Sequence, residues 1–237
     1  MNFVEGEILH INKPYGMTSF GALAFVRTRI SRKAGVKRVK TGHAGTLDPL
    51  ATGVLILCTG KCTKKIPTLQ YDSKEYTATL QFGATTASYD MEHEVSRTFP
   101  KEHITEDLVL EALQQFKGDI MQVPPTFSAV HVDGKRAYEL ARQIGGAEAQ
   151  ELEGTDIPPK PVHIEDIELL WYDDAEKRAQ IRVECGKGTY IRSLARDIGR
   201  AVGSGAYLTQ LCRTRLGDVR IEDCMTLDDF ETWLNNQ

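Results

Sequence analysis

The sequence predicts an α+β fold, in which strands and helices mix without the regular alternation of a doubly wound protein. Three observations lead to it: segments whose apolar residues alternate, segments whose apolar residues recur at helical spacing, and the irregular order of the two kinds. At 237 residues, 41% of them apolar, the chain can bury a sizeable core. We expect residues 1–237 to form a single domain.

The first half of the chain is expected to contain three strands and one helix. A short continuous apolar run favours a buried strand at 54–57, and Tyr76, Ala78, Leu80 and Phe82 share one face of an alternating strand. Thr18 or Ser19 can cap the helix. The elements expected here are a strand at 6–11, a helix from 18 or 19 to about 30, and strands at 54–57 and 75–82.

The second half is expected to hold four further helices and three strands. Thr105 with two following acids marks a helix start, and Gly118 is expected to close that helix. Asp133-Gly134 predicts a turn. The remaining expectations are a strand at 128–132, a short helix at 135–144, an acidic surface loop at 147–161, strands at 167–171 and 179–185, and helices led by Thr189 and Thr226.

The charges are unevenly spread, although the net charge is only −4. Between Ile8 and Tyr71 there are eleven basic side chains and one acid, Asp48. A second stretch, Lys187 to Arg220, has seven basic residues against two acids. Two such segments in an acidic protein favour a polyanion-binding face over ordinary solvated surfaces.

Several function classes find no support in the sequence. The five cysteines form no CxxC pair and the six histidines no HExxH, so we expect no metal site. Gly53–Cys62 fails as a phosphate loop because its glycines are too far apart and Cys62 replaces Ser or Thr, and Gly186-x-Gly188 lacks a third glycine. No apolar run approaches the ~18 residues of a membrane span. We therefore expect a cytoplasmic protein without a cofactor.

The most unusual segment is GHAGTLDPLATGVL, from Gly42 to Leu55. The proline after Asp48 biases the aspartate backbone toward extended conformations, and the glycines allow a close approach to a ligand. Cationic surroundings should keep Asp48 ionised and nucleophilic at neutral pH. Taken singly, Asp48 could be a turn residue. The other candidates also have ordinary explanations: a loop histidine (His43), a core aromatic (Tyr76), a solvated helix residue (Arg192) and a surface lysine (Lys13).

Together, these residues lie in blocks that resemble the TruB-type tRNA pseudouridine-55 synthases, the family that includes the catalytic part of dyskerin. The blocks occur in family order and cover nearly the whole chain. They are NKPYGMTS (12–19), the 42–55 segment, KEY (74–76), PTFSAV (125–130) with GKRAY (134–138), and CGKGTYIRSL (185–194).

The resemblance implies a mixed, largely antiparallel central sheet flanked by helices, with the site in a basic cleft. Asp48 matches the family nucleophile. Tyr76 matches the tyrosine that stacks on the target uracil and helps remove its C5 proton. Arg192 matches the arginine paired with that aspartate.

Further residues are implied as substrate contacts. His43 matches the histidine that helps hold the RNA with its target base extruded, and Tyr190 is a base contact in the same motif as Arg192. Lys13 and Leu211 match positions lining the pocket. Residues near 126–149 match an inserted RNA-clamping segment.

The chain departs from the family pattern in two places. The Thr-Asp-Thr-x-Asp stretch reads Thr86-Ala87-Ser88-Tyr89-Asp90, so only Asp90 is carried over as a substrate contact. The larger members also have a C-terminal RNA-binding domain of PUA type, which we do not expect before Gln237.

The function implied is isomerisation of uridine 55 in the TΨC arm of tRNA, by base flipping and attack of Asp48, without metal, membrane or obligate protein partner. Two alternatives stay open. One is a tRNA-binding or folding factor that does not catalyse. The other is a retaining glycosidase, which needs a second carboxylate; between Ile8 and Tyr71 there is no acid but Asp48 to supply it.

Overall fold

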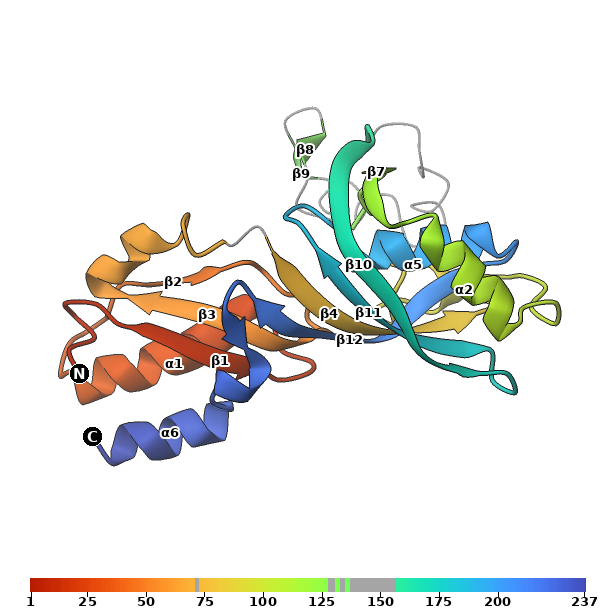
Figure 1. The fold of residues 1–237 in the computed structure, drawn as a ribbon. Helices are drawn as coiled ribbons and strands as arrows, with labels where there is room; N and C mark the ends of the chain where they lie inside the picture. The colour runs from red at the N-terminus through yellow and green to blue at the C-terminus, as the bar shows by residue number, and fades with distance from the viewer. Residues whose placement is uncertain (71–72, 128–130, 133–134, 137–156) are drawn as a thin grey trace. The chain divides into compact units, whose positions relative to one another are not determined.

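A computed structural model describes residues 1–70, 73–127, 131–132, 135–136 and 157–237 (Figure 1). The chain divides into two compact units, unit 1 with residues 1–76 and 211–237, and unit 2 with residues 77–210. The single-domain organisation stays a prediction, and most of the 126–149 segment and of the 147–161 loop lies outside the described residues. Lys135–Arg136 form strand β9, which pairs with β8 (His131–Val132), so the helix expected from residue 135 does not start there.

Unit 1 is built around strand β3 (Thr52–Thr59), which is buried along almost its whole length. Strands β1 (Ile8–Lys13) and β2 (Thr41–Ala44) pair with β3 in antiparallel fashion, whereas β12 (Ala206–Leu216) runs parallel to it at Thr52 and Gly53. The remaining elements of this unit are α1 (Ser19–Lys33), η1 (Gly60–Lys65), β13 (Val219–Arg220), η2 (Ile221–Asp223) and α6 (Leu227–Asn235).

Helices α1 and α6 lie side by side and cover one face of β1 and β3 (Figure 1). Helix α1 begins as expected, because the Thr18 side chain accepts a hydrogen bond from the Gly21 amide and caps the first turn. Its residues Ala22, Val26 and Ile30 recur at helical spacing and are buried against the strands. On the strands, this face consists of Leu9, Ile11, Leu55 and Leu57, which anchor the middle of β1 and β3 against the two helices.

Unit 2 has a sheet in the order β12, β4 (Lys74–Phe82), β11 (Arg178–Cys185), β10 (Lys160–Asp173) and β7 (Gly118–Gln122). Strand β10 is antiparallel to both of its neighbours. The other elements are α2 (Glu106–Gln114), α5 (Ile191–Ala201) and the antiparallel pair β5 (Ala84–Thr86) and β6 (Val95–Thr98). Strands β4 and β12 each continue from one unit into the other.

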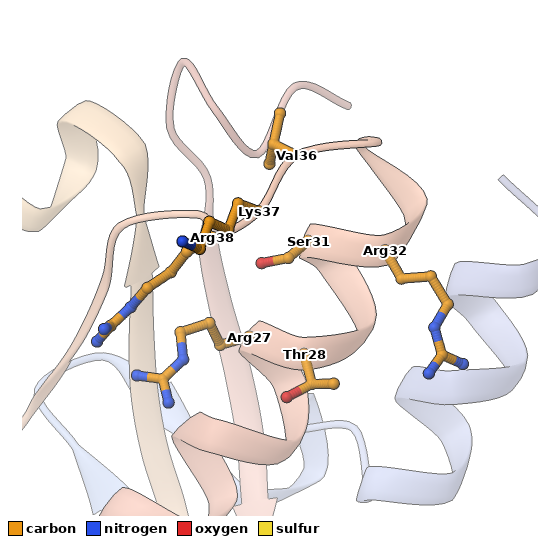
Figure 2. A pocket seen from close by; sticks show the side chains of 7 residues that line it. All are labelled: Arg27, Thr28, Ser31, Arg32, Val36, Lys37 and Arg38. Carbon is orange, nitrogen blue, oxygen red and sulfur yellow. The ribbon is translucent and has the colours of Figure 1, made fainter.

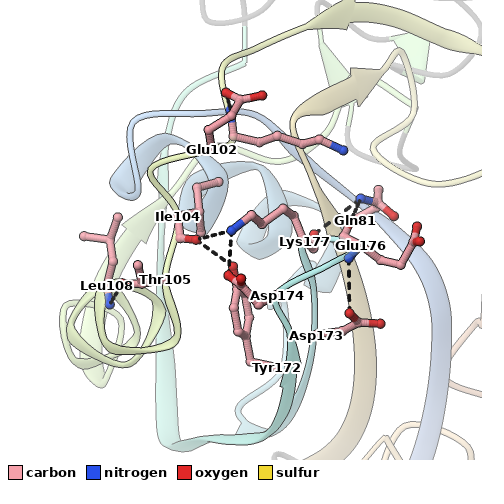
Figure 3. Close-up of polar contacts among 11 residues, drawn as sticks. Gln81, Glu102, Ile104, Thr105, Leu108, Tyr172, Asp173, Asp174, Glu176 and Lys177 are labelled. Carbon is pink, nitrogen blue, oxygen red and sulfur yellow. Dashed lines mark hydrogen bonds and ion pairs between the residues drawn. The ribbon is translucent and has the colours of Figure 1, made fainter.

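The turn between β10 and β11 is joined to the segment before α2 (Figure 3). The Tyr172 hydroxyl and the Lys177 ammonium both donate to the carbonyl oxygen of Ile104, at 2.8 and 2.9 Å. Lys177 has a left-handed backbone, with φ of 54°, that suits the tight turn. These bonds fix the hairpin on the loop from which α2 starts.

The mixed, largely antiparallel sheet flanked by helices confirms the expected fold class. Eight elements lie where the sequence predicts them: β1, β3, β4, β10 and β11, and the helices α1, α5 and α6. The helix begun at Thr105 stops at Gln114, and Gly118 starts strand β7 instead of closing the helix. The expectations did not include strands β2, β5, β6, β7, β12 and β13. Among the described residues, no helix combines the length and apolar content that crossing a membrane would need.

Candidate functional site

Asp48 lies in a tight turn between β2 and β3 in unit 1. The Ala51 amide donates to the Asp48 carbonyl at 3.1 Å and closes the turn, in which Pro49 occupies the position where its fixed φ is favoured. The Pro49 carbonyl accepts a further bond from the Gly16 amide at 3.0 Å. The Asp48 side chain is half-buried and its backbone is held on both sides.

The first turn of α1 holds the residue before Asp48. The buried Ser19 hydroxyl donates to the Leu47 carbonyl at 3.0 Å and accepts from the Leu47 amide at 2.8 Å. Leu47 itself is buried. One hydroxyl therefore satisfies both backbone groups of Leu47, which fixes the direction in which the chain enters Asp48.

Arg213 on β12 is a site residue that the sequence reasoning missed. Its side chain is 1% exposed, and it donates from Nε to the Val54 carbonyl at 2.8 Å and from a terminal nitrogen to the Gly45 carbonyl at 2.9 Å. These two carbonyls stand before and after Asp48 in the chain. A buried guanidinium thus joins the two sides of the Asp48 loop.

Two glycines of the loop are needed because Arg213 and its strand β12 lie so close to the loop backbone. Gly45 has φ of +75°, and a Cβ there would lie 3.3 Å from the Arg213 guanidinium. Gly53 has φ of +103°, and a Cβ there would lie 2.2 Å from the Arg213 carbonyl oxygen. Because real Cβ atoms do not approach backbone so closely, Gly53 is required for β12 to pair with β3.

Lys13 is fully buried at the end of β1, which corrects the interpretation of a surface lysine. Its ammonium group donates to the carbonyl oxygens of Pro14, Met17 and Pro49, at 2.9, 2.5 and 3.2 Å. Burial lowers the pKa of Lys13 to about 8; the negative charge of Asp48 opposes this shift, whereas the positive charge of Arg213 adds to it. Lys13 therefore lies close enough to Asp48 and Arg213 to interact with both charges.

We expect this buried lysine to make stability rise in alkaline solution. Between pH 8 and its ordinary pKa of 10.5, the unfolded chain holds a proton on Lys13 that the folded chain has lost, so unfolding becomes less favourable as pH rises through that window. The gain should reach about 3 kcal/mol in the free energy of unfolding. The measurement is denaturant unfolding of the wild type and Lys13→Met at several pH values, with the exposed Lys33→Met as control. A wild-type minus Lys13→Met difference that stays constant across the window would contradict the assignment.

His43, Tyr76 and Leu211 also belong to unit 1. Burial, followed by the charge of Arg213, lowers the pKa of His43, so the ring is neutral at pH 7. Its Nδ1 atom is buried and has no hydrogen-bond partner among the described residues. Tyr76 is buried near the start of β4. Leu211 lies two residues before Arg213 on β12, and its carbonyl accepts from the Thr52 hydroxyl at 3.4 Å.

Arg192 lies at the start of α5 in unit 2 and is 5% exposed. Its terminal nitrogens donate to the Ser88 carbonyl at 3.1 Å and the Phe127 carbonyl at 2.9 Å. Its Nε lies 3.8 Å from the Asp90 carboxylate. The interpretation of a solvated helix residue is therefore wrong. The pairing with Asp48 that the resemblance implies stays a prediction, since the two residues lie in different units.

Asp90 is a buried partner of this arginine. One carboxylate oxygen accepts from the Ser88 hydroxyl at 2.5 Å and from the Glu92 amide at 3.0 Å. Tyr89, between Ser88 and Asp90, has a left-handed backbone with φ of 59°. The strained turn thus directs Asp90 toward Arg192. Its assignment as a substrate contact stays a prediction, whereas its role in holding Arg192 follows from the geometry.

Tyr190 directly precedes α5 and is joined to β7 through Gln122. The Tyr190 amide donates to Gln122 Oε1 at 2.8 Å, and Gln122 Nε2 donates to the Tyr190 carbonyl at 3.2 Å. Gln122 is buried. This reciprocal pair satisfies both backbone groups of Tyr190 before the helix starts.

The eight candidates thus form two groups. Lys13, His43, Asp48, Tyr76 and Leu211 are in unit 1, and Asp90, Tyr190 and Arg192 are in unit 2. Within unit 1, the charge of Arg213 lowers the pKa of both Lys13 and His43, and its guanidinium donates to two carbonyls of the Asp48 loop. Among the described residues, no three His, Cys, Asp or Glu side chains gather as a metal site would need, and the expected absence of a metal stays a prediction.

We expect Arg213→Met to loosen the Asp48 loop and to change the titration of His43. Two buried carbonyls would lose their donor, which costs roughly 2–3 kcal/mol of unfolding free energy. Without the neighbouring charge, the pKa of His43 should rise. NMR titration of the His43 ring and denaturant unfolding measure the two effects, with Arg215→Met on the same strand as control. Unchanged His43 titration in Arg213→Met would contradict the proximity described above.

Comparison with known proteins points to one family. Residues 32–191 match the TruB family pseudouridylate synthase (N terminal domain), and residues 192–237 match the tRNA pseudouridylate synthase B C-terminal domain. A tRNA pseudouridine synthase B of Bacteroides thetaiotaomicron is 58% identical over 239 residues, covering 100% of this chain and 96% of the relative. One from Phocaeicola vulgatus is 56% identical over 237 residues, covering 100% and 97%.

A solved structure agrees with the fold. In the crystal structure of a Cbf5-Nop10-Gar1 complex, the matching chain superposes with a TM-score of 0.70 and 28% identity. The match covers 98% of this chain but only 55% of the solved one.

Proposed function

Because the chain belongs to the TruB family of pseudouridylate synthases, we propose that it converts uridine 55 in the TΨC arm of tRNA into pseudouridine, with Asp48 as the nucleophile. Full-length relatives above 50% identity that are named tRNA pseudouridine synthase B support the substrate class. The observation that carries the role of Asp48 is its turn, in which Ser19, Gly16 and Arg213 hold the neighbouring residues.

The reaction breaks the bond from ribose C1′ to uracil N1, turns the base, joins C1′ to C5 and releases the C5 proton. It requires a nucleophile and a proton acceptor, and no redox step. A carboxylate held in one place loses little freedom on attack, which lowers the barrier. The Lys13 charge lies near this half-buried carboxylate, and the Arg213 guanidinium donates to the loop that carries it.

The target uridine must leave the stacked loop before Asp48 can reach it. Flipping a base out costs a few kcal/mol, and stacking on an aromatic ring returns about 1–3 kcal/mol. We assign this stacking to Tyr76. The neutral ring of His43, whose Nδ1 lacks a partner among the described residues, would hold the RNA with the base extruded.

The test is to incubate the purified protein alone with an unmodified tRNA transcript and to map pseudouridine by position. The proposal expects modification at position 55, and none in a transcript with cytidine there. Pseudouridine at another position would support the reaction type but contradict the assignment to position 55. Tight binding without any pseudouridine would favour the non-catalytic tRNA-binding protein.

A further inference from the structure

A depression of about 390 Å³ lies where the end of α1 meets the following loop in unit 1 (Figure 2). It is lined by Arg27, Thr28, Ser31, Arg32, Val36, Lys37 and Arg38. Arg27 and Arg38 point to the same side of the helix, whereas Arg32 points away from it (Figure 2). The lining therefore combines cations with two hydroxyl groups.

Among the described residues, the cations of this depression have no carboxylate partner, unlike other basic residues of unit 1. Arg29 pairs with Glu231 at 2.8 Å, and Lys61 pairs with Glu5. No ion pair to a carboxylate in the described part of the chain involves Arg27, Lys37 or Arg38. Like charges on one side of a helix repel each other unless an anion lies between them.

The local fold brings these cations together. Gly35, with φ of +65°, follows the helix and reverses the chain. The buried Ser31 hydroxyl then accepts from the Val39 amide at 2.9 Å, which draws residues 36–38 back beside the last turns of α1. Arg27 also stands over Phe20, 5.5 Å from its ring, and Phe20 is 61% exposed. The arginine is thus steadied by an aromatic ring that remains open to solvent.

Stabilisation of the helix end explains only part of this charge. Basic residues in the last turn, Arg32 and Lys33, compensate the partial negative charge at the C-terminus of a helix. Arg27 lies more than a turn earlier and Arg38 lies after the chain reversal, so neither is placed for that role. Their convergence needs another explanation.

We propose that this depression binds the phosphodiester backbone of the substrate RNA, away from the target nucleotide. Arg27, Lys37 and Arg38 contact phosphate oxygens, and Phe20 packs on the adjoining sugar or base. The inference rests on the proposed function for the identity of the RNA. The proposal assigns RNA binding to only a few cations of the basic 8–71 segment. Others are unsuited to it, since Lys13 is buried and Arg29 and Lys61 are already paired with carboxylates.

The test compares full-length protein with Arg27→Gln/Arg38→Gln, and with a matched control, Lys117→Gln/Arg178→Gln, which removes the same charge from residues paired with Asp166 and Asp173. Affinity for an unmodified tRNA transcript is measured by filter binding between 50 and 400 mM salt. Each lost phosphate contact should reduce the slope of log affinity against log salt by about 0.7–0.9. The expected result is a slope smaller by roughly 1.5, and binding about tenfold weaker at 0.1 M salt, in the first variant only.

Modification of the same transcript separates this inference from the proposed function. We expect the first variant to raise KM and to leave kcat unchanged, because these residues do not touch the reacting atoms. If the wild type makes pseudouridine but both variants keep its salt slope, the depression does not bind RNA. If the salt slope falls by the same amount in both variants, the effect depends only on net charge, and the depression is not an RNA-binding site. A wild type that binds RNA without modifying it refutes the proposed function, while the slopes still decide this inference.

Discussion

Asp48→Asn is expected to abolish pseudouridine formation, by a factor of roughly a thousand or more, while tRNA binding is kept. Asparagine has the size and hydrogen-bonding reach of aspartate but neither its charge nor its nucleophilicity. The backbone bonds to Ala51 and those that hold Leu47 do not involve the side chain, so the loop should keep its shape. Removing a negative charge that faces a polyanion should leave affinity equal or slightly higher.

The two readouts must come from one preparation. Filter binding at fixed salt gives the affinity, and position-resolved mapping gives the pseudouridine formed in single-turnover conditions. Glu75→Gln, which neutralises a carboxylate outside the turn, serves as control. An Asp48→Asn enzyme that works at a rate near the wild type would remove Asp48 as nucleophile.

Arg192→Met is expected to destabilise unit 2 by about 3–5 kcal/mol, because it leaves the buried Asp90 carboxylate without its guanidinium. The carbonyls of Ser88 and Phe127 lose their donor as well. In a double-mutant cycle, Arg192→Met combined with Asp90→Asn should cost less than the sum of the two single changes. The free energies come from denaturant unfolding.

Arg200→Met, an exposed arginine on the same helix, provides the control. Strict additivity of the Arg192 and Asp90 changes would show that the two residues do not interact. An Arg192→Met protein with wild-type stability would contradict its buried position.

Local sequence signals predicted the helices α1, α2, α5 and α6 and the strands β1, β3, β4, β10 and β11, because those signals act over a few neighbouring residues. The Thr18, Thr105 and Thr226 caps each accept the expected amide, and the alternation in β4 and β11 matches their buried faces. By contrast, β12 reads AYLTQLCRTRL, with polar and charged residues throughout, so neither helical nor strand periodicity marks it. Its pairing with β3 decides its conformation.

The candidate site residues also divide into features that the sequence shows and features that depend on the tertiary structure. The chemical types that the reaction needs, and the glycine-rich loop that carries Asp48, are visible along the chain without any coordinates. The sequence does not show which charged side chains are buried, because burial depends on elements far apart in sequence. Lys13 and Arg192 each had a solvent-exposed interpretation that the structure overturns, and Arg213 was counted only as one cation of a basic stretch. Its guanidinium reaches the Asp48 loop only because β12 pairs with the first residues of β3, a contact across some 160 positions that no local pattern encodes.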